Sequence, residues 1–252
     1  MLIKEMLIKI PDDITDLYFC GDIHGNLNYI KYFINTGVGF PQQKILNSCI
    51  ILCGDVGLGF TPELENMNIS FLNKLCEETN NYIIAFRGNH DDPKQFKNIH
   101  RKRFKAVDDY TIVQFKNKNI LCIGGGTSID RVYRQNNDWK YWEDEKIVEL
   151  TDFDSLPYCS IIASHCAPVC TYPYGISQTI LDFCKSDPTL SNELIQERNY
   201  LQTLYEKMSE KGVVEDWYYG HYHKDKETFI ENTRFHLLGI NSILRYSFND
   251  YN

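Results

Sequence analysis

The sequence has no apolar run that approaches the roughly 20 residues needed to cross a bilayer. Its first ten residues, MLIKEMLIKI, carry charges and lack the apolar core and small-residue cleavage site of a secretory signal. We interpret this stretch as an ordinary first strand. These absences predict a cytoplasmic protein that does not bind membranes.

Positive charge is also scarce, because 26 Lys and Arg residues stand against 34 Asp and Glu residues, which gives a formal net charge of −8. Broad binding to nucleic acid requires a basic surface that neutralises phosphates, so we expect no strong nucleic-acid binding. A small nucleotide is not excluded, since a metal centre can supply local positive charge to an acidic protein.

The nine cysteines are not spaced as CxxC pairs, and most lie inside apolar segments such as LYFC and SCIILC. This pattern is typical of buried, reduced thiols in a cytoplasmic protein. Cys166 and Cys170 lie near a candidate ligand, His165, and could be reactive or bind metal, although their spacing does not demand it.

The first third of the chain alternates apolar runs with helical patterns. The apolar runs predict buried strands at residues 17–20, 49–53 and 82–86. The segment NLNYIKYFINTG predicts a helix that Gly37 ends, with one apolar face formed by Leu27, Ile30, Phe33 and Ile34. A strand–helix–strand order implies parallel pairing with right-handed crossovers.

A second helix is predicted from Glu63 to Thr79. Its apolar residues lie roughly on one face, which predicts the side that packs on the sheet: Leu64, Met67, Phe71, Leu72 and Leu75.

The rhythm then changes to hairpins. TIVQFKNKNILCIGGG predicts one hairpin, with its turn near Lys116 to Asn119, and residues 227–241 predict another, with its turn near 231–233. Further strands are predicted at 159–163 and 217–219. This mixture favours an α/β (α+β) fold with two stacked sheets, a β-sandwich flanked by helices, over one doubly wound sheet.

One domain is expected over residues 1–252, because no repeat or low-complexity tract divides the chain. Residues 171–214 differ from the rest, since TYPYG predicts a turn and the stretch from about Leu190 to Lys211 is helical and polar. We interpret 171–214 as a helical insertion in this domain. It lies between two histidine motifs, so we expect it to overhang the site.

Five of the seven histidines come just after a predicted apolar strand, namely His24, His90, His165, His221 and His223. In open α/β folds, ligands bind outside the carboxyl ends of strands. Several strands that deliver histidine, aspartate and asparagine to one edge would build a metal site.

Short glycine-flanked motifs supply the metal-binding candidates. GDIHGN gives Asp22 and His24, whose i, i+2 spacing directs both to one ion, and GDVG gives Asp55, whose two oxygens can bridge two ions. RGNHDD gives the Asn89 amide oxygen. The motifs ASH and GHYH add His165, His221 and His223. Mixed nitrogen and oxygen ligands suit Mn, Fe, Zn, Co or Ni, with Mn as our first expectation.

Together, GDIHGN, GDVG, GNHD, SH and GHYH resemble the motifs of calcineurin-like metallophosphoesterases, over roughly residues 17 to 240. The resemblance implies a four-layer architecture with a dinuclear site at one end of a β-sandwich. It assigns Asp22, His24 and His223 to one ion, Asn89, His165 and His221 to the other, and Asp55 to both. His90 matches a histidine that contacts the phosphoryl group and can protonate the leaving group.

The resemblance therefore implies a phosphoester hydrolase that acts on monoesters or diesters through a metal-activated hydroxide, with Asp55 and His90 as catalytic residues. GDVGLGF departs from the common GDxxDRG pattern, because the second aspartate and the arginine are absent. We favour small phosphorylated substrates such as nucleotides or cyclic nucleotides. The alternatives are a serine/threonine protein phosphatase and a non-catalytic scaffold that retains the metal site.

Three arginines are candidate substrate ligands beside Asn89 and His90. Arg87 precedes GNHD, and Arg131 and Arg134 lie in GGGTSIDRVYR. That stretch, with the later WKYW, resembles the small phage and bacterial members of the family. Each arginine could bind phosphate or a charged arm of the substrate. The alternative for each is a salt bridge with an acidic residue.

Overall fold

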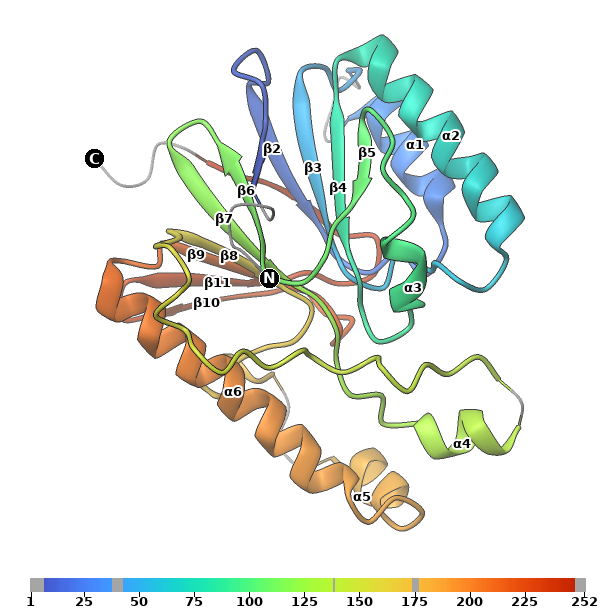
Figure 1. Ribbon diagram of the computed structural model, residues 1–252, viewed down its shortest axis with the longest axis vertical. Helices are drawn as coiled ribbons and strands as arrows, with labels where there is room; N and C mark the ends of the chain where they lie inside the picture. Colours follow the sequence, from blue (N-terminus) through green and yellow to red (C-terminus); the bar gives the residue numbers. More distant parts are fainter. Residues whose placement is uncertain (1–6, 38–42, 138, 174–176, 248–252) are drawn as a thin grey trace.

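Two β-sheets are stacked between helices in the computed structural model, which describes residues 7–37, 43–137, 139–173 and 177–247 (Figure 1). The first strand begins within this part at Leu7, and the start of the expected N-terminal strand lies outside the described residues. No helix among the described residues is long and apolar enough to cross a membrane.

The smaller sheet has five strands in the order β12-β2-β3-β4-β5. Its strands are β2 (Asp16–Cys20), β3 (Ser48–Cys53), β4 (Tyr82–Phe86), β5 (Phe104–Ala106) and β12 (Ile243–Arg245). β2 to β5 are parallel and β12 is antiparallel to β2. All six residues of β3 are buried, as its continuous apolar run predicts for a strand covered on both faces.

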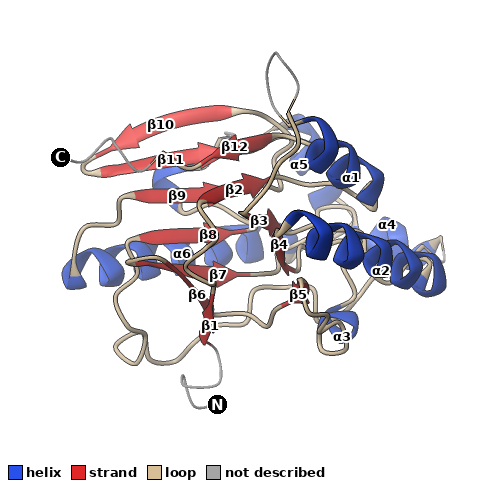
Figure 2. Ribbon diagram, turned by 90° about the horizontal axis from the view of Figure 1, so that it is seen from above, coloured by secondary structure: helices blue, strands red, loops and turns tan. Residues whose placement is uncertain are grey.

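The larger sheet has seven strands in the order β1-β6-β7-β8-β9-β11-β10, with β1 and β10 at opposite edges (Figure 2). Its strands are β1 (Leu7–Lys9), β6 (Thr111–Phe115), β7 (Lys118–Ile123), β8 (Ile161–Ser164), β9 (Asp216–Tyr219), β10 (Lys226–Ile230) and β11 (Thr233–Leu237). Both predicted hairpins form, as β6–β7 and β10–β11. β7, β8 and β9 are parallel neighbours.

Helices lie on the outer faces of both sheets and beside their carboxyl ends (Figure 1). They are α1 (Leu27–Thr36), α2 (Pro62–Thr79), α3 (Pro93–Phe96), α4 (Arg131–Asn136), α5 (Gln178–Cys184) and α6 (Leu190–Lys211), with a 3-10 turn at Val169–Thr171. α1 and α2 pack on the five-stranded sheet, and α6 packs on the seven-stranded sheet (Figure 1). The predicted sandwich flanked by helices is therefore confirmed.

Three apolar cores separate these four layers, because successive residues of each buried strand face opposite sides. Phe19 and Ile51 belong to the core between the sheets, whereas their neighbours Cys20 and Leu52 belong to the core beneath α1 and α2. Trp217 belongs to the third core, beneath α6.

The buried face of α2 differs from the prediction. Three residues expected to pack on the sheet are exposed: Leu64 (52%), Met67 (62%) and Phe71 (55%). The predicted Leu72 and Leu75 are buried, and Ile69 and Cys76, which the prediction did not include, complete the packed face. The rotation also buries Glu65, whose carboxylate accepts hydrogen bonds from backbone N–H groups of the preceding loop at 2.5 and 2.7 Å.

Parallel strands bring the carboxyl ends of both sheets to one end of the molecule. The loops after β2, β3 and β4 leave the smaller sheet there, and those after β8 and β9 leave the larger one. These five loops contain every predicted metal ligand. α4, α5 and the first turns of α6 gather at the same end (Figure 1).

Candidate metal centre

Four predicted ligands adopt a backbone conformation that L-residues seldom use. Their φ angles are positive: 42° at His24, 44° at Asp55, 68° at His221 and 53° at His223. Such strained positions are concentrated at functional sites, where the surrounding structure compensates for the strain. Here the tight turns direct the side chains of strand-end residues back toward one another.

The first group of predicted ligands lies close together. Asp22, His24, Asp55 and His223 each offer a ligand atom within 4.8 Å of the others. The Nε2 atoms of His24 and His223 are 3.0 Å apart, and the Nε2 atom of His223 is 3.0 Å from Oδ2 of Asp22. Two imidazoles and a carboxylate in such close contact form one potential coordination site.

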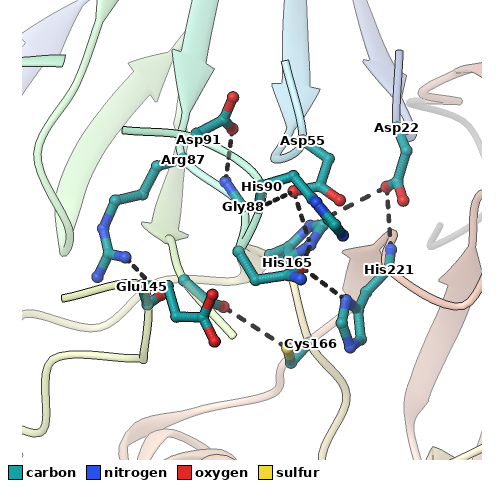
Figure 3. Close-up of polar contacts among 12 residues, drawn as sticks. Asp22, Asp55, Arg87, Gly88, His90, Asp91, Glu145, His165, Cys166 and His221 are labelled. Atoms are coloured by element: carbon teal, nitrogen blue, oxygen red, sulfur yellow. Dashed lines mark hydrogen bonds and ion pairs between the residues drawn. The ribbon is translucent and has the colours of Figure 1, made fainter. Parts of the chain in front are cut away.

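The second group converges on the amide oxygen of Asn89. Nε2 of His165 is 2.9 Å from this oxygen, and Nδ1 of His221 is 3.0 Å from it. Asp55 lies between the two groups, since its Oδ1 is 3.4 Å from Nε2 of His165 and its Oδ2 is 3.8 Å from Nδ1 of His24. The structure thus brings all seven predicted ligands together, with Asp55 between the two groups. Figure 3 shows Asp22, Asp55, His165 and His221.

These residues fit a site for cations. Oδ2 of Asp22 and Oδ2 of Asp55 are buried and accept no hydrogen bond from the described residues. Their near neighbours are imidazole nitrogens of His223 and His24, which are candidate ligands themselves. A buried ionised oxygen without a hydrogen bond is costly, and a metal ion would satisfy it. Four imidazoles, two carboxylates and one amide oxygen form a donor set that suits transition-metal ions.

Neighbouring groups fix the orientation of individual ligands. Nδ1 of His165 lies 2.9 Å from the carbonyl of Cys53, and when it donates to this carbonyl it leaves Nε2 free to bind an ion. The Asn89 amide donates from Nδ2 to Oγ of Ser128 at 2.8 Å, which turns its oxygen toward His165 and His221. Support of this kind raises metal affinity because the ligands need no reorientation on binding.

Glycine is required where the backbone approaches these carboxylates. A Cβ atom on Gly88 would lie 2.1 Å from Oδ1 of Asp55, and one on Gly220 would lie 2.2 Å from Oδ1 of Asp22. These separations are far below van der Waals contact. The glycines of GNHD and GHYH therefore leave room for the two central carboxylates.

The charges of the cluster perturb its histidines in opposite directions. Burial tends to lower the pKa of His165, but the charge and hydrogen bond of Asp55 outweigh it and raise the pKa to about 10. Burial, with the neighbouring positive charge of His165, lowers the pKa of His221 to about 3. The compact group of carboxylates is thus strong enough to hold positive charge in a buried place, as a metal site must be.

His90 lies beside the ligand cluster and lines the adjoining pocket. Its backbone N–H donates to Oδ1 of Asp55 at 2.8 Å, and its Nδ1 is 3.4 Å from Nη1 of Arg134. Burial, assisted by the positive charge of Arg134, holds the pKa of His90 below its ordinary value despite the opposing charge of Asp55. The ring is placed to contact a substrate.

Asp91 is a supporting residue that the sequence analysis did not identify. Its buried carboxylate accepts four backbone N–H bonds of 2.6–3.0 Å, three from residues 56–58 and one from Gly88 (Figure 3). Burial, together with the charge of Asp55, raises its pKa to about 6. Asp91 holds the loop after β3 against the loop after β4, and so supports GDVGLGF without the missing second aspartate. The only signal was the aspartate that directly follows His90 in RGNHDD.

A second buried network links Asn89 and His90. The Glu145 carboxylate accepts from the backbone N–H of Ser128 at 2.8 Å, from its hydroxyl at 2.7 Å and from Nη2 of Arg134 at 3.2 Å. Ser128 contacts Asn89, and Arg134 approaches His90. Glu145 therefore supports the candidate ligand Asn89 through Ser128 and the candidate catalytic residue His90 through Arg134.

The other two predicted substrate arginines are engaged in buried ion pairs. Arg87 binds Asp109 at 2.7 Å and donates to the carbonyls of residues 144–146. Arg131 binds Asp187 and Glu193 of the 171–214 segment, at 2.5 Å for the Asp187 contact. Substrate binding by either arginine stays a prediction, and it would require these ion pairs to break.

A pocket of about 570 Å³ opens beside the cluster. On one side it is lined by Asp55, Asn89, His90, His221 and His223, and much of the other side belongs to α5, α6 and the segment before them. Cys166 is buried nearby, and its Sγ atom lies 3.5 Å from the carbonyl oxygen of Gly125. Burial raises the pKa of this thiol well above its usual value, so it is not a ready thiolate ligand.

Comparisons with known proteins agree with this geometry. The sequence matches the family model for calcineurin-like phosphoesterases over residues 16–225, and no curated protein matches it. Among solved structures, TT1561 of Thermus thermophilus is 12% identical, with a TM-score of 0.50 and 91% of each chain covered. At this identity the likeness concerns the fold alone.

Two further structures are more distant. A putative 5'-nucleotidase of Staphylococcus aureus has a TM-score of 0.47 at 12% identity, over 94% of this chain and 51% of that one. The phosphopantetheinyl hydrolase PptH of Mycobacterium tuberculosis has a TM-score of 0.45 at 10% identity, over 96% and 99%. Because the family model spans most of the sequence, the chain belongs to the calcineurin-like phosphoesterase family and is a metal-dependent phosphoester hydrolase.

Proposed function

We propose that the protein uses a dinuclear transition-metal centre to hydrolyse small phosphomonoesters or phosphodiesters, with nucleotides and cyclic nucleotides as candidate substrates. The proposed ligands are Asp22, His24 and His223 for one ion, Asn89, His165 and His221 for the other, and Asp55 for both. Manganese is our first expectation, and iron, zinc, cobalt and nickel suit the same donors. A cytoplasmic location remains an expectation from the sequence.

The observation that carries this proposal is the pair of buried carboxylate oxygens without hydrogen bonds, Oδ2 of Asp22 and Oδ2 of Asp55. The histidines nearest to them, His24 and His223, are themselves candidate ligands and come from loops of both sheets. Such an arrangement would be unfavourable as a purely structural network, because two charged oxygens would stay buried without a hydrogen bond. It becomes favourable when cations occupy it.

Bound ions would polarise the phosphoryl oxygens and provide a hydroxide at neutral pH. The protein's own groups would then divide the remaining tasks. His90 lines the same pocket as the ligands and would donate a proton to the departing oxygen. Arg134, 3.4 Å from the His90 ring, would hold that ring in place, and the helical segment over the pocket would limit access of bulk water.

The pocket favours small substrates over protein substrates. Its volume of about 570 Å³ falls within the range of roughly 300–1,000 Å³ that is common for small-molecule sites. α5 and α6 form a wall beside the ligands, whereas a protein phosphatase requires a shallow groove open to a polypeptide. This wall is the reason to rank the protein phosphatase alternative second.

The proposal is tested by metal analysis combined with a parallel assay. Protein loaded with manganese is given p-nitrophenyl phosphate, bis-p-nitrophenyl phosphate, cyclic nucleotides and a phosphopeptide. We expect about two ions per chain and turnover of the small esters. Turnover of the phosphopeptide far above all others would support a protein phosphatase. Lack of turnover with each of the five metals would support the scaffold alternative.

A further inference from the structure

The pocket beside the metal-ligand cluster has an apolar wall that the chemistry at phosphorus does not use. This wall is formed by Ile129, Tyr172, Ile180, Phe183, Leu194 and Tyr222. The bound phosphoryl group would lie at the ligands, so the wall must face the remainder of the substrate. The residues on it therefore determine which leaving groups bind well.

One cation, Arg198 of α6, lines this part of the pocket. Its guanidinium carbon lies 3.9 Å from the centre of the Tyr172 ring, and its Nε donates to the carbonyl of Leu194 at 2.8 Å. These contacts hold the planar group in one orientation. Within the described part of the chain, its two terminal nitrogens have neither a hydrogen-bond acceptor nor a carboxylate partner.

The carboxylates that share the pocket with Arg198 are engaged elsewhere. Asp55 belongs to the metal-ligand cluster, and Asp130 forms an ion pair with Arg134 at 3.1 Å. Glu197 precedes Arg198 in the helix, but it is buried and accepts from the backbone N–H of Thr127 at 2.7 Å. The positive charge of Arg198 is thus left for a ligand.

We propose that Arg198 is a substrate-binding residue that selects phosphoesters whose leaving group carries a second anion, a carboxylate or another phosphate. The inference rests on the proposed function, because it assumes that the scissile phosphoryl group binds at the metal-ligand cluster. A guanidinium binds either anion through two parallel hydrogen bonds. Its half-buried position beside apolar side chains strengthens that attraction relative to water.

This arrangement contrasts with the three arginines that the sequence singled out. Arg87, Arg131 and Arg134 each form an ion pair with a buried or partly buried carboxylate, so an incoming anion would have to compete with an existing ion pair. Arg198 has no such competitor among the described residues. It is also held by a ring and a carbonyl, so binding an anion would cost little additional side-chain entropy.

The test measures binding of non-hydrolysable phosphonates to manganese-loaded protein by calorimetry. The probes are phenylphosphonate, two variants with a para carboxylate on arms of different length, and 1,4-phenylene bisphosphonate. We expect at least one carboxylate or the bisphosphonate to bind about tenfold to a hundredfold more tightly than phenylphosphonate, as one charge-assisted pair provides. The better of the two anions identifies the kind of second group.

Substitutions then assign the preference to Arg198. Arg198→Met keeps an unbranched side chain against Tyr172. In this variant the affinity for the better two-anion probe, divided by the affinity for phenylphosphonate, should fall to about one. Arg198→Lys keeps the positive charge but cannot donate two parallel hydrogen bonds to one anion, so it should give an intermediate ratio. Arg101→Met, at an exposed arginine outside the pocket, should keep the ratio of the unaltered protein.

The inference is overturned if no second anion improves binding, or if Arg198→Met keeps the full ratio. Hydrolysis of phenyl phosphate by the unaltered protein separates this outcome from failure of the proposed function. A protein that hydrolyses phenyl phosphate but shows no anion preference would leave the proposed function intact and refute the role of Arg198. A protein that shows no hydrolysis with any of the five metals would refute the proposed function itself.

Discussion

The rim of predicted metal ligands and the helical wall formed by α5 and α6 face the same pocket, but different forces hold them. The rim consists of short turns at strand ends, fixed by backbone hydrogen bonds to buried carboxylates such as Asp91 and by glycines with no room for a side chain. The wall is joined to α4 by ion pairs of Arg131, and to the loop before α4 by the bond from Thr127 to Glu197.

This difference separates two kinds of function. A rim held by the sheets has little freedom, as the placement of two ions requires. Residues of the helical wall can be substituted without disturbing the strand ends, because the wall is held by contacts between side chains. We therefore expect substitutions in the rim to remove metal and activity, and substitutions in the wall to change selectivity or stability while the metal remains.

The largest effect is expected for Asp55→Ala. Asp55 lies between the two ligand groups, with one oxygen near His24 and the other near His165, so its loss should reduce metal content and lower hydrolysis of p-nitrophenyl phosphate to background. Metal analysis and initial rates measure both effects. Asp12→Ala, at an exposed aspartate, is the control. Two ions retained in Asp55→Ala would contradict the bridging role.

His90→Asn should be the next most severe change. Loss of a general acid typically costs about 10²–10⁴-fold in rate, and His90 contacts Asp55 only through its backbone, which the substitution preserves. The rate constant should therefore fall while metal content stays at the level of the unaltered protein. Substrates with good leaving groups should be affected least, since they need less protonation. A uniform loss across leaving groups would argue against an acid role.

Ser128→Ala should weaken the binding of one ion by about tenfold. Removal of a residue that orients a metal ligand typically lowers metal affinity by about 10–100-fold, and we expect an effect near the lower value. The Asn89 amide would lose the acceptor at 2.8 Å that directs its oxygen toward the histidines. Titration of metal-free protein with manganese would report the two affinities. Ser70→Ala, whose exposed hydroxyl bonds only within α2, provides the matched control. Equal weakening of both ions would indicate a general loss of structure instead.

Arg131→Met tests the wall with the smallest expected effect on chemistry. It leaves Asp187 unpaired and should lower the free energy of unfolding by about 3 kcal/mol, as breaking a buried ion pair does. Denaturant titration measures this loss, which Asp187→Asn in the same chain should partly restore. Metal content should not change. If Arg131→Met released the metal, the rim and the wall would not be independent.

The sequence by itself was most informative about the rim. Continuous apolar runs marked β3 and β4, and motifs at strand ends marked residues that parallel pairing must bring to one edge. The reason is physical: a strand buried on both faces leaves its signature in consecutive residues, and a turn that carries a ligand needs glycine within one or two positions. Both signals involve residues that are close together in the sequence, so they can be recognised without knowledge of the fold.

Other features depended on contacts between distant segments. The face by which α2 packs could not be read from its apolar residues, because Leu64, Met67 and Phe71 are exposed while Glu65 is buried. The sequence also made Arg87 and Arg131 candidate phosphate ligands, and only the fold brought Asp109 and Asp187 to them.

Arg198, in contrast, lies in a polar helix with no motif around it. Whether an arginine is neutralised depends on which carboxylate lies within about 4 Å of it, and that neighbour can be tens of residues away in the chain. The sequence by itself determined which predicted ligands meet at the strand ends, because parallel pairing brings those ends to one edge. Only the tertiary structure decided that Arg198, among the described residues, faces the pocket without a carboxylate partner.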